Sequence, residues 1–319
     1  MPGITGPNAG DAHHIIEGKN MIKVAVIGLD TSHSVIFPKL MQAPECEKNM
    51  RVPGMKAISC LRFETPFQNK EGLDKRQQQL EQWGVKVTEN IDEALEGCDA
   101  VMLEINDGRF HLEYFKKVAA LGKPVFLDKP LAMTLADGRA ILELARKHHT
   151  RVWSGSSIPF CPPLAKILKE AGKIQRAHVF GALGLAPAGD SLVWYGVHSF
   201  ETLQRIMGPG ALKTQAFATA HSIIAAVEFK DGREGVVELT PEVWTYGGVV
   251  SGMVKEQMKT LPFVLDSSLC YRNILRLIKA FFLGAEPPVN METTFEGLAM
   301  MCAARESIRR GKPVCVETL

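Results

Sequence analysis

Six short apolar runs recur through the first half of the chain, and helix-like stretches separate them. The runs cover residues 22–27, 56–61, 85–88, 99–105, 124–127 and 151–154. Apolar runs of this length, closed by glycine, proline or polar residues, are typical of strands buried on both faces of a sheet. Strands that alternate with helices form a doubly wound parallel sheet. We therefore expect a Rossmann-like α/β domain over residues 21–157.

The pattern changes after Gly155, where prolines at 159, 162 and 163 mark a boundary. Beyond it we expect a helix and a long strand, then a strand-rich segment with a hairpin turn at Asp231-Gly232, then two late helices. Their ranges are 164–171, 174–185, 211–240, 267–283 and 293–310. Residues 158–319 are thus predicted to form an α+β domain of mostly antiparallel sheet. Residues 1–20 lack the features of a signal peptide and are interpreted as a flexible extension.

Composition narrows the range of partners and compartments. The net charge of +2 gives no bulk attraction for nucleic acid. No apolar run approaches the roughly 20 residues that span a bilayer. The seven cysteines are scattered without a CxxC pair, so we expect free or buried thiols rather than a disulfide framework or a zinc site. Such thiols are typical of a reducing compartment, and we predict a cytoplasmic protein without nucleic-acid or membrane partners and without a metal site.

The turn after the first strand is where a dinucleotide-binding chain carries the motif GxGxxG. Here the six residues are Gly28-Leu-Asp-Thr-Ser-His33, so Asp30 and His33 replace two of the three glycines. We expect Asp30, Thr31 or Ser32 to cap the following helix, because these residue types are good caps. A carboxylate at Asp30 repels phosphate unless it turns away. The helix N-terminus still offers amide donors to an anion, and Thr31 and Ser32 add hydroxyls.

Other polar residues follow strand ends, where ligands bind in open α/β sheets. Arg62, after the second predicted strand, suits either the 2′-phosphate of NADP or an exposed loop, and the sequence leaves both open. Asp107 lies in the turn after the strand at 99–105. Asp128, Lys129 and Pro130 directly follow the strand at 124–127, which places Asp128 and Lys129 where chemistry is expected.

A second cluster of candidate residues lies in the second half. If a helix begins near Val197, His198 and Glu201 lie one turn apart on the same face, with Tyr195 at the helix entrance. A histidine, a carboxylate and a phenol in this arrangement suit proton transfer to and from a hydroxyl. The alternative is that His198 is half-buried and pairs with Glu201 for structural reasons.

The two clusters together resemble motifs of the Gfo/Idh/MocA family of sugar and polyol dehydrogenases. Asp128-Lys129-Pro130 is similar to the family's Glu-Lys-Pro motif, and Gly196-Val-His198 to its Gly-x-His motif. The resemblance implies an NAD(P)-dependent oxidoreductase in which Lys129 lies beside the nicotinamide and the substrate hydroxyl. It implies that His198 acts as acid/base or orients the substrate, positioned by Glu201 or Tyr195.

The resemblance also implies where the ligands and partners bind. NAD or NADP is expected over Gly28 to His33, near Asp107 and Asp128. The expected substrate is a small carbohydrate-like molecule, and the expected assembly is a homodimer or homotetramer formed through the open face of the second sheet.

The chain departs from the family pattern at several positions. Trp194 stands where the family often has Asp, and Pro159 where many members have Arg. These departures keep two other hypotheses open. One is a lyase or hydrolase that oxidises a sugar transiently and then returns the hydride. The other is a ligand-binding or regulatory protein that retains the fold without the redox reaction.

Overall fold

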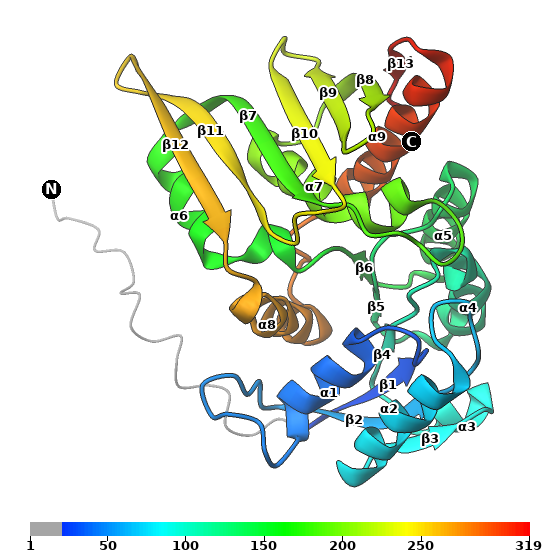
Figure 1. The fold of residues 1–319 in the computed structure, drawn as a ribbon. Coiled ribbons are helices and arrows are strands. Elements are labelled where there is room, and N and C mark those ends of the chain that lie inside the picture. Colours follow the sequence, from blue (N-terminus) through cyan, green and yellow to red (C-terminus); the bar gives the residue numbers. More distant parts are fainter. Residues whose placement is uncertain (1–20) are drawn as a thin grey trace, which may run out of the picture.

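The computed structural model describes residues 21–319, which form two sheets joined by helices (Figure 1). The first sheet belongs to the first half of the chain, and the second sheet, with its long hairpin, to the second half. The interpretation of residues 1–20 as a flexible extension concerns a segment that lies outside the described residues.

The first sheet has six parallel strands in the order β3-β2-β1-β4-β5-β6. This is the Rossmann order, in which the chain reverses direction across the sheet between β1 and β4. The strands are β1 (Ile22–Ile27), β2 (Met55–Leu61), β3 (Lys86–Thr88), β4 (Ala100–Leu103), β5 (Val125–Leu127) and β6 (Val152–Ser154). The prediction of a doubly wound parallel sheet is confirmed, with strand ends that differ from the expected ones by one or two residues.

Side chains that alternate along each strand bury both faces of this sheet. Val24 and Val26 of β1 face one hydrophobic cluster, and Ala25 and Ile27 face the other. Helices α1 (His33–Gln42), α2 (Lys70–Gln82) and α8 (Cys270–Phe282) contribute to the first cluster. Helices α3 (Ile91–Leu95), α4 (His111–Val118) and α5 (Leu135–His148) contribute to the second. Burial on both faces explains why the strands are continuous apolar runs.

The second sheet has seven strands in the order β12-β11-β7-β10-β9-β8-β13. All neighbouring pairs in it are antiparallel except β7 and β10, as the sequence predicts for a mostly antiparallel sheet. The strands are β7 (Lys173–Ala182), β8 (Ala211–Ala218), β9 (Ile223–Phe229), β10 (Glu234–Thr240), β11 (Tyr246–Val254), β12 (Gln257–Leu265) and β13 (Val314–Cys315). Three helices pack on it: α6 (Pro162–Ala171), α7 (Ser191–Met207) and α9 (Met291–Arg310).

Helix α8 comes from the second half of the chain but packs on the first sheet. Ile274, Ile278 and Phe281 of α8 lie in the same buried cluster as Phe37 of α1, and Figure 1 shows the two helices next to each other. Because α8 packs on the first sheet, its contacts cross the predicted domain boundary at residue 157. The division into domains of residues 21–157 and 158–319 therefore remains a prediction.

One expectation about the cysteines is wrong. Cys161, at the start of α6, and Cys270, at the start of α8, form a disulfide across 109 residues of sequence. The sequence offers no local spacing that indicates this pair, because the fold alone brings the two residues together. The other five cysteines are free, and all of them except Cys315 are buried. Among the described residues, no helix is long and apolar enough to cross a bilayer.

Candidate functional site

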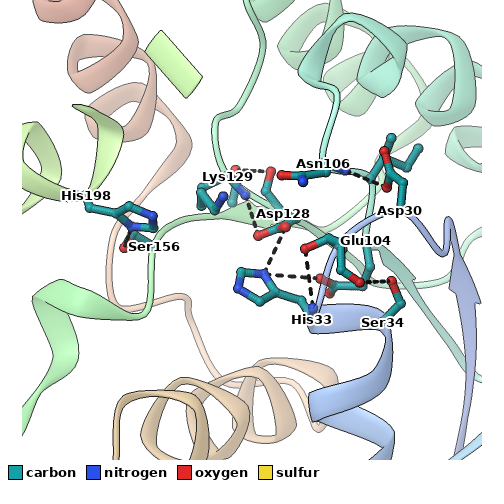
Figure 2. Close-up of polar contacts among 12 residues, drawn as sticks. Asp30, His33, Ser34, Glu104, Asn106, Asp128, Lys129, Ser156 and His198 are labelled. Atoms are coloured by element: carbon teal, nitrogen blue, oxygen red, sulfur yellow. Dashed lines mark hydrogen bonds and ion pairs between the residues drawn. The ribbon is translucent and has the colours of Figure 1, made fainter. Parts of the chain in front are cut away.

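The candidate site lies where β1, β4 and β5 end at the carboxyl edge of the first sheet. Gly28 follows β1, Glu104 follows β4, and Asp128 and Lys129 follow β5. Because β4 lies between β1 and β5, these residues meet at one edge of the sheet. Figure 2 shows His33, Glu104 and Asp128 on one side of Lys129, with Ser156 and His198 on the other. The site is therefore built at the switch point of the sheet, as expected for a ligand site in this fold.

Gly28 is required by the turn after β1. Its φ is +106°, and an added Cβ would overlap the backbone oxygen of Glu104 at the end of β4. An L side chain rarely adopts this backbone conformation, and here it also has no space. The first glycine of the predicted motif is thus explained by the close approach of two strand ends.

The expectation that Asp30 caps α1 is wrong. Its carboxylate instead joins two loops, because Oδ1 accepts a hydrogen bond from the backbone N–H of Asn106 (2.8 Å) and Oδ2 accepts one from Thr65 Oγ1 (2.7 Å). Ser32 occupies the N-cap position of α1 without a side-chain capping bond to any described residue, while Thr31 Oγ1 accepts a bond from the N–H of His33 (3.3 Å). The residue type of Asp30 favours a helix cap, but its carboxylate binds the backbone N–H of Asn106 in a neighbouring loop instead of an N–H of the helix.

Burial raises the pKa of Asp30, although the hydrogen bonds from Asn106 and Thr65 oppose the shift. The carboxylate is only 1% exposed, so it does not project into solvent above the loop. The carboxylate is instead held by the loops that follow β2 and β4.

Arg62 and Asp107 are engaged within their own segments. Arg62 donates to Asp74 (2.5 Å) and to Gln77 (2.6 Å), both on α2. Asp107 is buried and forms an ion pair of 2.6 Å with Arg109. The structure thus does not bring Arg62 or Asp107 into the cluster around Lys129, and their predicted contacts with a cofactor remain predictions.

Lys129 and Asp128 form the charged centre of the site. Lys129 is only 4% exposed, and its backbone N–H donates to Asp128 Oδ1 (2.8 Å). Asp128 Oδ2 lies 2.9 Å from His33 Nδ1. Burial alone would raise the pKa of Asp128, but His33 and Lys129 outweigh it and hold the pKa at about 2. Asp128 is therefore a carboxylate at neutral pH and offsets the cost of burying the Lys129 cation.

His198 and Glu201 meet through Ser156 rather than directly. Ser156 Oγ lies 2.7 Å from His198 Nδ1, and Ser156 N–H donates to Glu201 Oε2 (2.6 Å). Burial and the nearby charge of Lys129 lower the pKa of His198 well below its usual range. Burial raises the pKa of Glu201 to about 7. The predicted shared face of the helix is confirmed, but the structural link is a serine from the loop after β6.

Helix α7 begins at Ser191, six residues earlier than the sequence suggested, so Tyr195 lies inside the helix and not at its entrance. Asp190 caps this start, because its Oδ1 accepts bonds from the N–H groups of Leu192 and Val193. The Tyr195 ring lies 5.1 Å from the His198 ring in an edge-on contact. Tyr195 is thus placed beside His198, and its predicted role in proton transfer stays a prediction.

Three residues of the site were not identified from the sequence. They are Glu104 and Asn106, at the end of β4, and Ser156, in the loop after β6. Asn106 accepts a 2.9 Å hydrogen bond from Trp194 Nε1, which joins the two halves of the chain beside the site. The position of Glu104 and Asn106 at a strand end is the one signal that could have indicated them.

Comparison with known proteins identifies the first domain. Residues 22–156 match the family model of GFO_IDH_MocA, described as an oxidoreductase family with an NAD-binding Rossmann fold. No curated protein matches the chain by sequence.

Solved structures resemble the chain over almost its full length. A probable dehydrogenase from Thermotoga maritima is 17% identical, with a TM-score of 0.75 over 92% of this chain and 99% of that one. A myo-inositol dehydrogenase from Corynebacterium glutamicum is 14% identical, with a TM-score of 0.74 over 94% of this chain and 100% of that one.

A scyllo-inositol dehydrogenase from Lactobacillus casei, solved with NAD(H) and scyllo-inositol, is also 14% identical, with a TM-score of 0.74 over 93% of this chain and 99% of that one. At these identities the likeness shows a common two-domain fold. Residues 22–156 thus match a family of oxidoreductases with an NAD-binding Rossmann fold, and the solved structures share the fold of both halves of the chain.

Proposed function

We propose that the protein is an NAD(P)-dependent oxidoreductase that transfers a hydride to or from the CH–OH group of a sugar, cyclitol or related polyol. The observation that carries the proposal is the arrangement of Lys129 and His198. Two residues far apart in sequence, each matching a motif of the family, are buried at one site between the two halves of the chain. The family match of the first domain supports the cofactor class.

The turn after β1 fits a dinucleotide in spite of its unusual sequence. Gly28 allows the close approach of strand ends that the fold requires. The carboxylate of Asp30 is withdrawn to Asn106 and Thr65, so it does not point at a phosphate. Ser32 is exposed at the start of α1, where the helix N-terminus favours an anion. We propose that Gly28 to His33 would hold the pyrophosphate of a nicotinamide cofactor, which would supply the hydride chemistry at the site.

Lys129 would stabilise the negative charge that develops on the substrate oxygen. An ammonium group held in a buried site acts more strongly on such a charge than it would in water. Because Asp128 remains a carboxylate, it fixes the Lys129 backbone and balances the buried cation.

His198 would accept the hydroxyl proton. Its lowered pKa keeps the imidazole neutral at physiological pH, which leaves a ring nitrogen free to act as a base. Ser156 holds Nδ1, and Glu201 in turn holds the backbone of Ser156, so the ring is oriented by a chain of two hydrogen bonds. Tyr195 packs against the ring from the side.

A pair of substitutions tests these roles. Lys129→Met is expected to lower kcat by about 10²- to 10⁴-fold with NAD and either scyllo-inositol or myo-inositol as probe substrates, since it removes the charge that stabilises the alkoxide. Lys129→Arg keeps the charge and is the matched control, which should retain more activity. Cofactor affinity, measured by calorimetry, should change less than turnover in both variants. Full activity of Lys129→Met on a turned-over substrate would contradict the assignment.

The open face of the second sheet supports a homodimer or homotetramer. Phe217, Val249, Met258 and Val264 are exposed on strands whose other face is covered by helices. Exposed apolar residues gathered on one sheet face are typical of an interface. Light scattering coupled to gel filtration should give two or four chains per particle. A cytoplasmic location also remains a proposal.

A further inference from the structure

The turn after β1, the end of β4 and the end of β5 place three metal-binding side chains together. One ligand atom each from His33, Glu104 and Asp128 lies within 4.8 Å of the other two. We propose that these three residues bind a divalent transition-metal ion, of which Zn²⁺ is the representative. The proposal goes beyond the oxidoreductase function and does not depend on it.

The distances in the cluster suit a single ion. His33 Nδ1 lies 2.9 Å from Asp128 Oδ2 and 3.9 Å from Glu104 Oε2. Two ligand atoms that are each about 2.1 Å from one ion are at most about 4.2 Å apart. Both separations that involve His33 fall within this limit, and the ligand atoms of Glu104 and Asp128 lie within 4.8 Å of each other. One ion can therefore contact all three side chains after a small movement of the carboxylates toward each other.

Glu104 is the observation that points to a ligand. Its side chain is 0% exposed, yet neither carboxylate oxygen has a hydrogen-bond partner among residues 21–319. An ionised carboxyl here leaves two buried acceptors without donors, and a protonated one leaves a buried donor without an acceptor. Either state leaves a buried polar group unsatisfied, which is costly. A cation between Glu104 and Asp128 would satisfy the Glu104 carboxylate.

The charges around the cluster also favour a cation. Glu104 and Asp128 bring two acidic groups into a buried region where Lys129 is the cation that interacts with both. Two carboxyl groups thus face a single ammonium group, and a bound cation would place a second positive charge beside them. Burying an unpaired charge is costly, and coordination of a metal is one of the common ways in which proteins avoid it.

The two ligands beside Glu104 are held in place by their surroundings. The His33 ring packs between Phe37 (5.5 Å between ring centroids) and Tyr271 of α8 (5.2 Å). Asp128 Oδ1 accepts from the Lys129 N–H, which turns Oδ2 toward His33. Such supporting contacts orient metal ligands in known sites. One imidazole with two carboxylates suits Zn²⁺, Fe²⁺ or Mn²⁺ more than the soft ions that prefer thiolates.

The sequence predicts no metal site, because positions 33, 104 and 128 share no ligand spacing that a motif could reveal. Three strand ends of one sheet bring them together.

Metal content after reconstitution tests the proposal. The full chain is stripped with a chelator, incubated with ZnCl₂, separated from free metal by gel filtration and analysed by mass spectrometry. We expect the wild type to retain one more Zn²⁺ per chain than Glu104→Gln, which keeps the shape of the side chain and removes its charge. Glu238→Gln is the matched control, because Glu238 forms an exposed pair with His178 (3.2 Å) on the second sheet. It should retain as much metal as the wild type.

A spectroscopic measurement on the unaltered protein keeps the test decisive even if a variant fails to fold. Co²⁺ added to the stripped wild type should give visible d–d absorption bands of a bound ion, and Zn²⁺ should abolish them. Equal zinc content in the wild type and a folded Glu104→Gln, or absent Co²⁺ bands in the wild type, would overturn the proposal. Neither readout uses NAD or a substrate, so failure here is separate from failure of the oxidoreductase function.

Discussion

Ser156 shows how a single residue outside any motif can organise a site. Its hydroxyl holds His198 Nδ1 and its N–H holds Glu201, so the two residues that the sequence places on one helix face are joined by a loop residue. A serine in a loop has no pattern that separates it from its neighbours, and its partners are 42 and 45 residues away. The sequence could indicate His198 and Glu201 from their helical spacing, but not the link between them.

Glu201 should make stability depend on pH. Its pKa rises from 4.5 in the unfolded chain to about 7 in the folded protein because burial disfavours the charge. The folded state therefore holds the proton more tightly, and the free energy of unfolding should fall as the pH rises from about 4.5 to 7. The expected loss of unfolding free energy is about 2 kcal/mol. This is less than the full shift in pKa would give, because Glu201 borders a water-accessible cavity.

Urea denaturation across this pH range measures the effect. Glu201→Gln should reduce the decrease in unfolding free energy between pH 4.5 and 7. Glu64→Gln, at an exposed position, should leave that decrease unchanged. An unaltered slope in Glu201→Gln would show that another group is responsible.

Asp30 and Gly28 illustrate what was and was not predictable at the residue scale. Gly28 ends a strand at a position where the fold requires a glycine, and its role followed from the pattern. The role of Asp30 depends on the loops of two other strands, so propensity gave the wrong partner. Local preference is a weak guide where a buried N–H from elsewhere in the chain competes.

At the scale of elements, Asp30 fastens the loops after β1, β2 and β4 to one another. Asp30→Ala should lower the free energy of unfolding by about 1–3 kcal/mol, because it leaves the N–H of Asn106 without its acceptor. Thr65→Val removes one donor to the same carboxylate and should cost less. Chemical denaturation compares the two variants, and an Asp30→Ala protein as stable as Thr65→Val would contradict the bridging role.

The elements of the first half were predicted more fully than those of the second. Buried parallel strands are short, uniform apolar runs, and each was found. Strands β11 and β12 contain glycines, a proline and many exposed residues, so their alternation is weak and they were not predicted. Helix α7 begins earlier than predicted because Asp190 caps it and allows the helix to start at Ser191.

At the scale of the whole molecule, α8 joins the two halves. It packs on α1 through its apolar face and is tied to the start of α6 by the disulfide between Cys161 and Cys270. Neither connection has a local sequence signal, because both depend on where the second half folds against the first. The alternation of strands and helices predicts a parallel sheet followed by a mostly antiparallel one. It does not predict that α8 packs on the first sheet.

Thiol titration tests the disulfide. The denatured, unreduced protein should present five thiols, those of Cys46, Cys60, Cys98, Cys302 and Cys315. After reduction all seven cysteines should react. Cys270→Ser should present six thiols without reduction, since it frees Cys161. Seven reactive thiols in freshly purified, unreduced wild type would show that the pair is open in the protein.

The measurement that tests the central claim most directly is calorimetric titration of the purified protein with NAD, NADH, NADP and NADPH. A nicotinamide-dependent oxidoreductase in which the Asp30 carboxylate is bonded to Asn106 and Thr65 should bind at least one of the four nucleotides. The expected stoichiometry is about one per chain. Nucleotide binding should persist in Lys129→Met, because Lys129 is proposed to contact the substrate oxygen and not the pyrophosphate. If none of the four nucleotides binds to the folded wild type, the account of the protein as a nicotinamide-dependent oxidoreductase is wrong.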